Sequence, residues 1–259
     1  MATLTSFNHQ TGTHLDIDGA RLYVERAGDL GKPPLVLLHG GFGNIEDFNG
    51  LLPTLAKDFH LIGIDSRGHG ASTLGGDALS YQRLERDVLQ ALAHLDISRA
   101  SILGFSDGGI TACRIAASGK LELDKLAVVG TPWRLEEASK ALYAKVTPDS
   151  WKQKFPGTFE AYQRLNPEPD FARFAQATIQ MWQDPSPSGH PEESIGQIRA
   201  PVLIVRGDDD HLVSLDSAVE FKRRVKGARF MNLPFAGHVA FDDQKDAFLA
   251  GVNQFFSQG

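Results

Sequence analysis

Short apolar runs alternate along the chain with longer stretches of helical periodicity. Five of these runs show little alternation between apolar and polar residues, and they cover residues 35–38, 61–64, 100–103, 126–129 and 202–205. Unalternated runs of this length are typical of strands that are buried on both faces, as in a parallel sheet covered by helices. The pattern therefore predicts an α/β fold in which a parallel sheet is flanked by helices.

A different pattern precedes these runs near the start of the chain. Residues 14–17 and 21–24 alternate between apolar and polar side chains with a period of two, and Asp18-Gly19 lies between them. Two alternating segments joined by an Asp-Gly pair are a strong signal for a tight antiparallel hairpin. We expect this hairpin at the edge of the sheet.

The regular rhythm of short apolar runs breaks from about residue 131 to residue 193. This segment holds eight of the 13 prolines and all three tryptophans. Such a mixture favours short helices joined by proline-containing loops. We expect a helical cap, or lid, over residues 131–195, inserted into a core formed by residues 1–130 and 196–259. The alternative is a set of ordinary connecting helices held by aromatic contacts.

Composition and charge narrow the class of protein. The 259 residues are 42% hydrophobic and 22% charged, which is the profile of a soluble globular chain with a sizeable core. The net charge is −6, and the longest basic run, residues 222–224, lies on the expected exposed face of a helix. Nucleic acid and anionic membranes are therefore poor candidates for partners, and the sequence gives no oligomeric state.

The single cysteine and the N-terminal segment bear on the cellular location. Cys113 has no partner for an internal disulfide and lies among alanines and isoleucines, so we expect a buried small hydrophobe. The first 19 residues contain no basic segment followed by an apolar one, and no window reaches the roughly 20 apolar residues of a membrane span. We expect a cytoplasmic protein without a membrane segment.

The strongest candidate for chemistry is Ser106, within Gly104-Phe105-Ser106-Asp107-Gly108. This G-x-S-x-G pattern follows an apolar run and precedes an Ala- and Ile-rich helical stretch, which is the context of a nucleophile on a sharp strand-to-helix turn. In such a turn, side chains at Gly104 and Gly108 would clash with the closely packed backbone. The pattern predicts that Ser106 is a nucleophile. A serine that only caps the helix is the alternative.

A nucleophilic serine needs a base and an acid that orients the base. Nine histidines compete for the first role, and we choose His238, on a loop after the strand-like residues 229–233. For the acid we choose Asp210, the last of three consecutive aspartates after the run 202–205, with Asp208 as second choice. A solvated acidic turn or a weak calcium loop is the alternative for these aspartates. The serine, acid and histidine follow one another along the chain in that order.

A glycine-rich loop after the first apolar run is the candidate oxyanion site. It reads His39-Gly40-Gly41-Phe42-Gly43, and we expect the backbone N–H of Gly41 or Phe42, with that of Asp107, to hold developing negative charge. A phosphate-binding loop is the competing interpretation. It fails because Asn44-Ile45-Glu46 follows, so that G-x-G-x-x-G lacks its last glycine, and because no lysine followed by serine or threonine is present.

Together, these motifs resemble the α/β-hydrolase superfamily over nearly the whole chain. The resemblance rests on five motifs in order, at residues 39–43, 65–70, 104–108, 207–210 and 237–238. It implies an eight-stranded, mostly parallel sheet with a helical cap inserted after the sixth strand. Relatives with an aspartate nucleophile are haloalkane dehalogenases and epoxide hydrolases, so the resemblance with Ser106 at this position argues against those reactions. Some relatives carry the acid after the sixth strand, but Gly130-Thr131-Pro132 offers no carboxylate, which favours Asp210.

The Ser-Asp-Gly-Gly form of the elbow is similar to the biphenyl-hydrolase-like subgroup, which includes amino-acid ester hydrolases. This resemblance implies that the Asp107 carboxylate attracts a substrate ammonium group. The alternative is that Asp107 pairs with an arginine or caps the helix that begins there.

We therefore predict a serine hydrolase that cleaves small carboxylic esters through an acyl-enzyme. Ser106 attacks, His238 moves the proton and Asp210 orients His238, while Phe105, Asp107 and Trp133 are candidate substrate contacts. This chemistry needs no metal ion and no organic cofactor, and its partner is a small-molecule ester. Two alternatives stay open, a hydrolase of carbon–carbon bonds in ring-cleavage diketones and a non-catalytic binding protein on the same fold.

Overall fold

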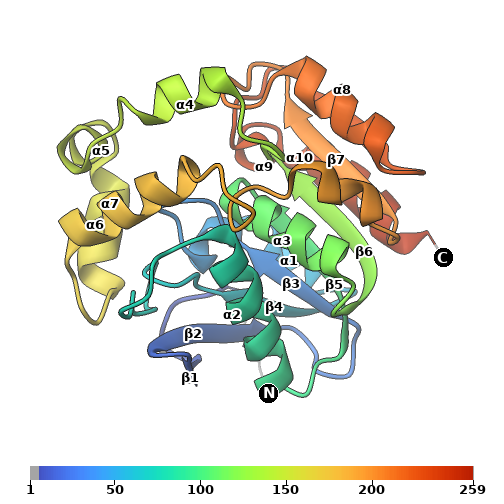
Figure 1. Ribbon diagram of the computed structural model, residues 1–259. Coiled ribbons are helices and arrows are strands. Elements are labelled where there is room, and N and C mark those ends of the chain that lie inside the picture. The colour runs from blue at the N-terminus through green and yellow to red at the C-terminus, as the bar shows by residue number, and fades with distance from the viewer. Residues whose placement is uncertain (1–5, 259) are drawn as a thin grey trace.

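An eight-stranded sheet forms the centre of the computed structural model, which describes residues 6–258 (Figure 1). The first five residues, part of the N-terminal segment in which no leader was expected, lie outside the described residues. The strands lie in the order β1-β2-β4-β3-β5-β6-β7-β8. Their bounds are β1 (Thr13–Ile17), β2 (Ala20–Ala27), β3 (Pro34–Leu38), β4 (His60–Ile64), β5 (Arg99–Phe105), β6 (Glu122–Val129), β7 (Val202–Gly207) and β8 (Arg229–Leu233). Each apolar run of the sequence is one of these strands.

The predicted hairpin is β1 and β2, which pair antiparallel at the edge of the sheet with Ile17 opposite Ala20. Asp18 and Gly19 form the turn with φ angles of 43° and 75°. Two left-handed residues give the twist that joins antiparallel strands tightly. β2 also pairs antiparallel with β4, and all remaining neighbours pair parallel, so the prediction of a mostly parallel sheet is confirmed.

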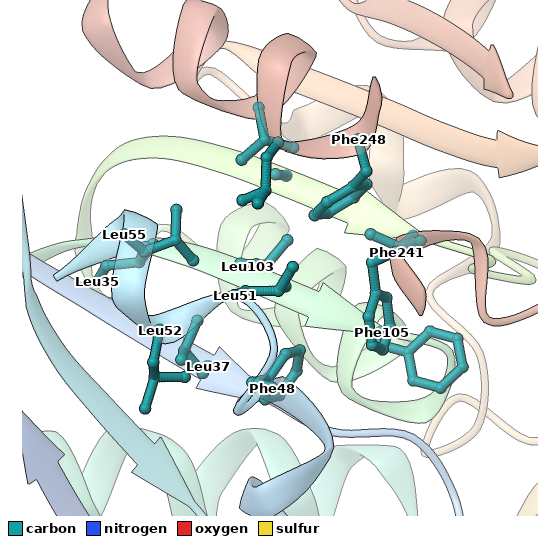
Figure 2. Close-up of a cluster of buried hydrophobic side chains, with 14 of the residues drawn as sticks. Leu35, Leu37, Phe48, Leu51, Leu52, Leu55, Leu103, Phe105, Phe241 and Phe248 are labelled. Carbon is teal, nitrogen blue, oxygen red and sulfur yellow. The ribbon is translucent and has the colours of Figure 1, made fainter. Parts of the chain in front are cut away.

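Alternate residues of the central strands enter two separate hydrophobic clusters, one on each face of the sheet. Leu35 and Leu37 of β3 face α1 (Leu52–Leu55), α9 (Ala240–Asp243) and α10 (Lys245–Ser257), and part of this cluster is drawn in Figure 2. Val36 and Leu38 face α2 (Tyr81–His94), α3 (Asp107–Ser118) and α8 (Leu215–Arg224). Burial on both faces explains why the strands read as unalternated apolar runs.

Four short helices lie between β6 and β7, and we call them the lid helices. They are α4 (Glu137–Tyr143), α5 (Pro148–Lys154), α6 (Pro156–Leu165) and α7 (Phe171–Trp182), and they gather at the upper left of Figure 1. Pro148 and Pro156 stand in the first turns of their helices, where a missing N–H costs nothing. The division into an independent core and cap at residues 131–195 stays a prediction.

The two ends of this lid segment meet at the core. The Glu192 N–H donates to the carbonyl of Trp133 at 3.1 Å, and the Leu135 N–H donates to the Glu192 carboxylate at 3.0 Å. Glu192 is also the first residue of the 3₁₀ helix η2 (Glu192–Gln197), whose Ile195 is buried in the cluster that includes residues of α3. The lid therefore leaves and returns to the core at one place.

Several smaller predictions concern single residues and helices. Cys113 is completely buried, and burial raises the pKa of its thiol far above the ordinary value, so it is an inert core residue. The basic run 222–224 lies exposed at the end of α8, as expected. Of the helices within residues 6–258, none has the length and apolar character needed to cross a lipid bilayer.

Candidate active site

Ser106 stands at a strained turn between β5 and α3. Its φ of 50° and ψ of −116° lie outside the regions that residues with a side chain usually adopt. The Ser106 N–H donates to the carbonyl of Val129 in β6 at 2.9 Å, and its own carbonyl accepts from Ile110 in α3 at 3.0 Å. These bonds hold the turn against both neighbouring elements, and the strain is thereby maintained by the surrounding fold.

The glycines on either side of Ser106 are required by space. A Cβ atom on Gly104 would lie 2.6 Å from the carbonyl oxygen of Gly108. One on Gly108 would lie 2.0 Å from the carbonyl oxygen of Leu38, at the end of β3. The predicted clash at both positions is confirmed, and α3 begins in direct contact with the sheet because these two side chains are absent.

His238 lies between Ser106 and Asp210. Its Nε2 is 3.1 Å from the Ser106 Oγ, and its Nδ1 is 3.0 Å from Asp210 Oδ2. The two loops that carry the acid and the histidine are joined by backbone hydrogen bonds, since the amides of Asp208 and Asp209 donate to the carbonyls of Leu233 and Ala236. The structure thus brings the three residues chosen from the sequence into one hydrogen-bonded line.

Asp210 is buried, whereas the second choice, Asp208, is exposed. Asp210 Oδ1 accepts from the amides of Leu212 and Val213 at 2.8 and 3.1 Å. Burial by itself would raise the pKa of Asp210, but the hydrogen bond and charge of His238, with these two amides, hold it below its ordinary value. Asp210 is therefore an anion that can fix the Nδ1–H tautomer of His238 and leave Nε2 to accept a proton from Ser106.

The glycine-rich loop turns sharply above the end of β3. The Gly43 N–H donates to the Gly40 carbonyl at 3.1 Å, and Phe42 has a left-handed φ of 60°. Within residues 6–258, the amides of Gly41, Phe42 and Asp107 donate to no other residue. Backbone donors without a protein partner beside a serine hydroxyl are what an oxyanion site requires.

The motif at residues 65–70 is hydrogen-bonded to the start of this loop and to Ile45, just after its end. The Ser66 N–H donates to His39 Nε2 at 3.0 Å, and Asp65 Oδ1 accepts from the amide of Ile45 at 3.0 Å. The ring of His69 lies 5.1 Å from that of His39, and burial lowers the pKa of His69 to about 3. A neutral, buried His69 thus packs against the histidine that begins the loop.

Asp107 points away from bulk solvent and is 6% exposed. The Tyr81 hydroxyl donates to Asp107 Oδ1 at 2.8 Å, and the Trp182 indole N–H donates to Oδ2 at 2.7 Å. Burial raises the pKa of the Asp107 carboxyl, and these two hydrogen bonds oppose the rise. Neither hydrogen-bond partner of the Asp107 carboxyl is an arginine. Through Tyr81 and Trp182, Asp107 connects the nucleophile turn to α2 and to the lid helix α7.

The two aromatic candidates for substrate contact differ in position. The Phe105 ring packs edge-on against Phe241 (Figure 2). It also lies 5.1 Å from the His238 ring, so it supports the histidine. Trp133 is 1% exposed, and its indole N–H donates to the carbonyl of Ser217 in α8 at 3.0 Å. The prediction that Trp133 contacts substrate is wrong, because the ring is enclosed in the core cluster beneath α8.

Comparison with known proteins shows which family this chain belongs to. The family model described as the alpha/beta hydrolase fold matches residues 33–189. The chain belongs to the α/β-hydrolase family. It is 28% identical to the human serine hydrolase BPHL over 241 residues. The aligned region covers 88% of this chain and 80% of that relative.

Two further comparisons extend over nearly full length. The chain is 24% identical to the pimeloyl-[acyl-carrier protein] methyl ester esterase of Nitrosomonas europaea, over 89% of this chain and 98% of that protein. The crystal structure of a hydrolase from Pseudomonas aeruginosa PA01 shares the fold, with a TM-score of 0.79 at 23% identity, over 97% of this chain and all of the other. The chain is therefore an α/β-hydrolase with esterase relatives.

Sequence reasoning missed the side chains that this hydrolase places around Asp107 and Phe42. Tyr81 and Trp182 donate to Asp107, and the Trp151 ring stacks on Phe42 with centroids 4.1 Å apart. For the two tryptophans the signal was the aromatic richness of residues 131–193, which does not say which ring faces the site, and Tyr81 lies outside that segment. Across the described residues, no three His, Cys, Asp or Glu side chains are grouped to hold a metal ion.

Proposed function

We propose that this hydrolase cleaves small carboxylic esters through an acyl-enzyme formed on Ser106. The observation that carries the proposal is the hydrogen-bonded line from Ser106 through His238 to the buried Asp210, with separations of 3.1 and 3.0 Å. A serine, a base and an orienting acid within hydrogen-bond reach are the requirements for nucleophilic acyl transfer. The esterase among the relatives supports the same class of substrate.

The mechanism follows from the positions of the atoms. The Ser106 Oγ attacks the ester carbonyl while its proton passes to His238 Nε2, and the Asp210 carboxylate stabilises the imidazolium through Nδ1–H. The amides of Asp107 and of Gly41 or Phe42 receive the developing negative charge. His238 then protonates the leaving alcohol. Water, deprotonated by His238, attacks the acyl-enzyme and releases the carboxylic acid and free Ser106.

The direct test is a panel of p-nitrophenyl esters from acetate to octanoate, combined with labelling by a fluorophosphonate. We expect turnover of the shorter esters and one label per chain, located on Ser106 by mass spectrometry. The Ser106→Ala variant should neither turn over nor take up label. A folded wild-type protein that shows neither turnover nor labelling would favour the non-catalytic binding protein instead.

A narrower proposal concerns amino-acid esters and depends on Asp107. Its carboxyl group belongs to the residue next to the nucleophile, where a substrate ammonium beside the scissile carbonyl would stabilise the ionised form. Tyr81 and Trp182 already donate to its two oxygens, so the ammonium would join these two donors at the carboxylate. The proposal predicts faster hydrolysis of alanine methyl ester than of its N-acetyl form. Equal rates for the two esters would remove it and leave the general esterase proposal intact.

A further inference from the structure

The lid residue Trp182, at the end of α7, contacts both backbone segments of the candidate oxyanion site. On one side its indole N–H donates to Asp107 Oδ2 at 2.7 Å. Asp107 is the first residue of α3, and its amide is one of the expected oxyanion donors. On the other side the ring lies edge-on to Phe42, with centroids 5.4 Å apart at 78°. One side chain of the lid thus bridges two segments that are far apart in the sequence.

The contact with the glycine-rich loop is close. A Cβ atom on Gly41 would lie 2.7 Å from Trp182 Cζ2 and 2.6 Å from Asp107 Oδ2. The indole and the carboxylate therefore pack directly against the Gly41 backbone, and Trp182 is itself 8% exposed. Because these contacts involve backbone on one side and a buried ring on the other, neither segment can shift without moving Trp182.

Phe42 needs such support because its backbone is strained. A left-handed φ of 60° costs a residue with a side chain about 1 kcal/mol or more. Its ring is 5% exposed and packs among aromatic rings of the lid, which are Trp151, Phe171, Phe174 and Trp182. The lid rings thus enclose Phe42 in its left-handed conformation, in which its amide donates to no other residue of the part of the chain that the structure describes.

We propose that Trp182 is a positioning residue that fixes the distance between the oxyanion donors of the glycine-rich loop and of Asp107. Oxyanion stabilisation requires donors at 2.7–3.1 Å from the oxygen, so a shift of either segment by half an ångström weakens it. The effect falls on the transition state and not on the bound ester, because negative charge develops on the oxygen only as the tetrahedral intermediate forms. This inference rests on the proposed esterase function.

The test compares Trp182→Phe with Trp133→Phe. Both variants remove one buried indole N–H with a single acceptor, Asp107 in the first case and Ser217 in the second. For Trp182→Phe we expect kcat on p-nitrophenyl acetate to fall about 10- to 100-fold with KM within threefold, since loss of a whole oxyanion donor costs about 10²–10³. Trp133→Phe should lower the Tm while leaving kcat within twofold.

A second measurement separates positioning from a general loosening of the fold. Phenylboronic acid forms a tetrahedral adduct with an active serine and places a boronate oxygen at the oxyanion site. Its inhibition constant should rise in Trp182→Phe by the same factor by which kcat falls. A Trp182→Phe protein with a lowered Tm but with kcat and boronate affinity within threefold of wild type would overturn the proposal and leave Trp182 a structural anchor.

The experiment also separates this inference from the proposed function. Absence of ester turnover and fluorophosphonate labelling in the wild type would contradict the function, whereas normal wild-type activity with an unaffected Trp182→Phe would contradict the inference alone. Should Trp182→Phe fail to fold, Phe42→Leu keeps the hydrogen bond from Trp182 to Asp107 and removes the aromatic contacts of Phe42 with Trp182 and the other lid rings. It should show the same loss of kcat and of boronate affinity, and an unchanged kcat would contradict the inference.

Discussion

The ends of the strands and the lid helices hold their parts of the candidate site by different means. Ser106, Asp210 and His238 are positioned by backbone, through hydrogen bonds between loops and through glycines that let elements touch. Phe42 and Asp107 are contacted from the lid by large side chains, Trp151 and Trp182. Positions fixed by backbone depend on a few glycines at set places in the sequence, whereas positions fixed by packing depend on the shape of whole rings.

The largest effect should come from the strand ends, through Ser106→Ala. Removing the nucleophile of such a triad lowers kcat by about 10⁶-fold, and we expect a loss of that size on p-nitrophenyl acetate. The Tm should change little, since the Ser106 side chain makes no other hydrogen bond within residues 6–258 than that to His238. Residual turnover within tenfold of wild type would show that Ser106 is not the nucleophile.

The next effect concerns the acid. Asp210→Asn keeps the size of the side chain but no longer fixes the tautomer of His238, so kcat should fall by about 10⁴-fold. The matched control is Asp208→Asn, an exposed neighbour whose carboxylate accepts from Asn232 and does not contact His238. Its kcat should stay within twofold of wild type. Equal losses in the two variants would mean that the acid was assigned to the wrong aspartate.

Two glycine-to-alanine substitutions, one in the core and one in the lid, test the comparison through the free energy of unfolding. Gly108→Ala places a Cβ 2.0 Å from the Leu38 carbonyl, so we expect unfolding to become easier by about 3 kcal/mol or more. Gly157→Ala, in the lid helix α6, meets no atom within 4 Å and should stabilise the protein by about 0.5–1 kcal/mol. Urea denaturation measures both. A destabilising Gly157→Ala would show that the lid backbone is as constrained as the core.

The smallest loss is a pH-dependent decrease in the free energy of unfolding, which arises from one charged contact near the edge of the core. His9 lies between Glu46 and Asp65, each at 2.8 Å. Burial alone would lower the pKa of His9, but the hydrogen bonds and charges of Asp65 and Glu46 raise it to about 9.

Because this pKa lies above the unfolded value of about 6.5, the contribution of His9 is complete below pH 6.5 and is lost as the pH rises toward 9. A rise of the pKa from 6.5 to about 9 corresponds to about 3 kcal/mol, so we expect a loss of up to that size between denaturation curves at pH 6 and pH 9.5. His9→Gln should reduce the difference between the two curves. A difference of the same size in that variant would assign the effect to other groups.

The sequence predicted the strand ends well and the lid contacts poorly. The hairpin, the strands and the line from Ser106 to Asp210 follow from local signals, because apolar runs, turn glycines and polar residues after strands each have a direct structural cause. Trp133 and Trp182 show where this reasoning stops. Both are tryptophans near the ends of one aromatic segment, yet one is enclosed beneath α8 and the other donates to Asp107. Which way a ring faces depends on helix positions that no short pattern encodes.

The junction of the lid has a consequence for how this enzyme family can diversify. Because Glu192 and Trp133 are joined by a backbone hydrogen bond, the lid is an insertion whose two ends stay together whatever its length. Doubling the length of such an insertion costs only about 0.6 kcal/mol in closure entropy. Insertions and deletions in the lid can therefore accumulate without disturbing the register of β6 and β7, as long as α7 keeps Trp182 in contact with Asp107.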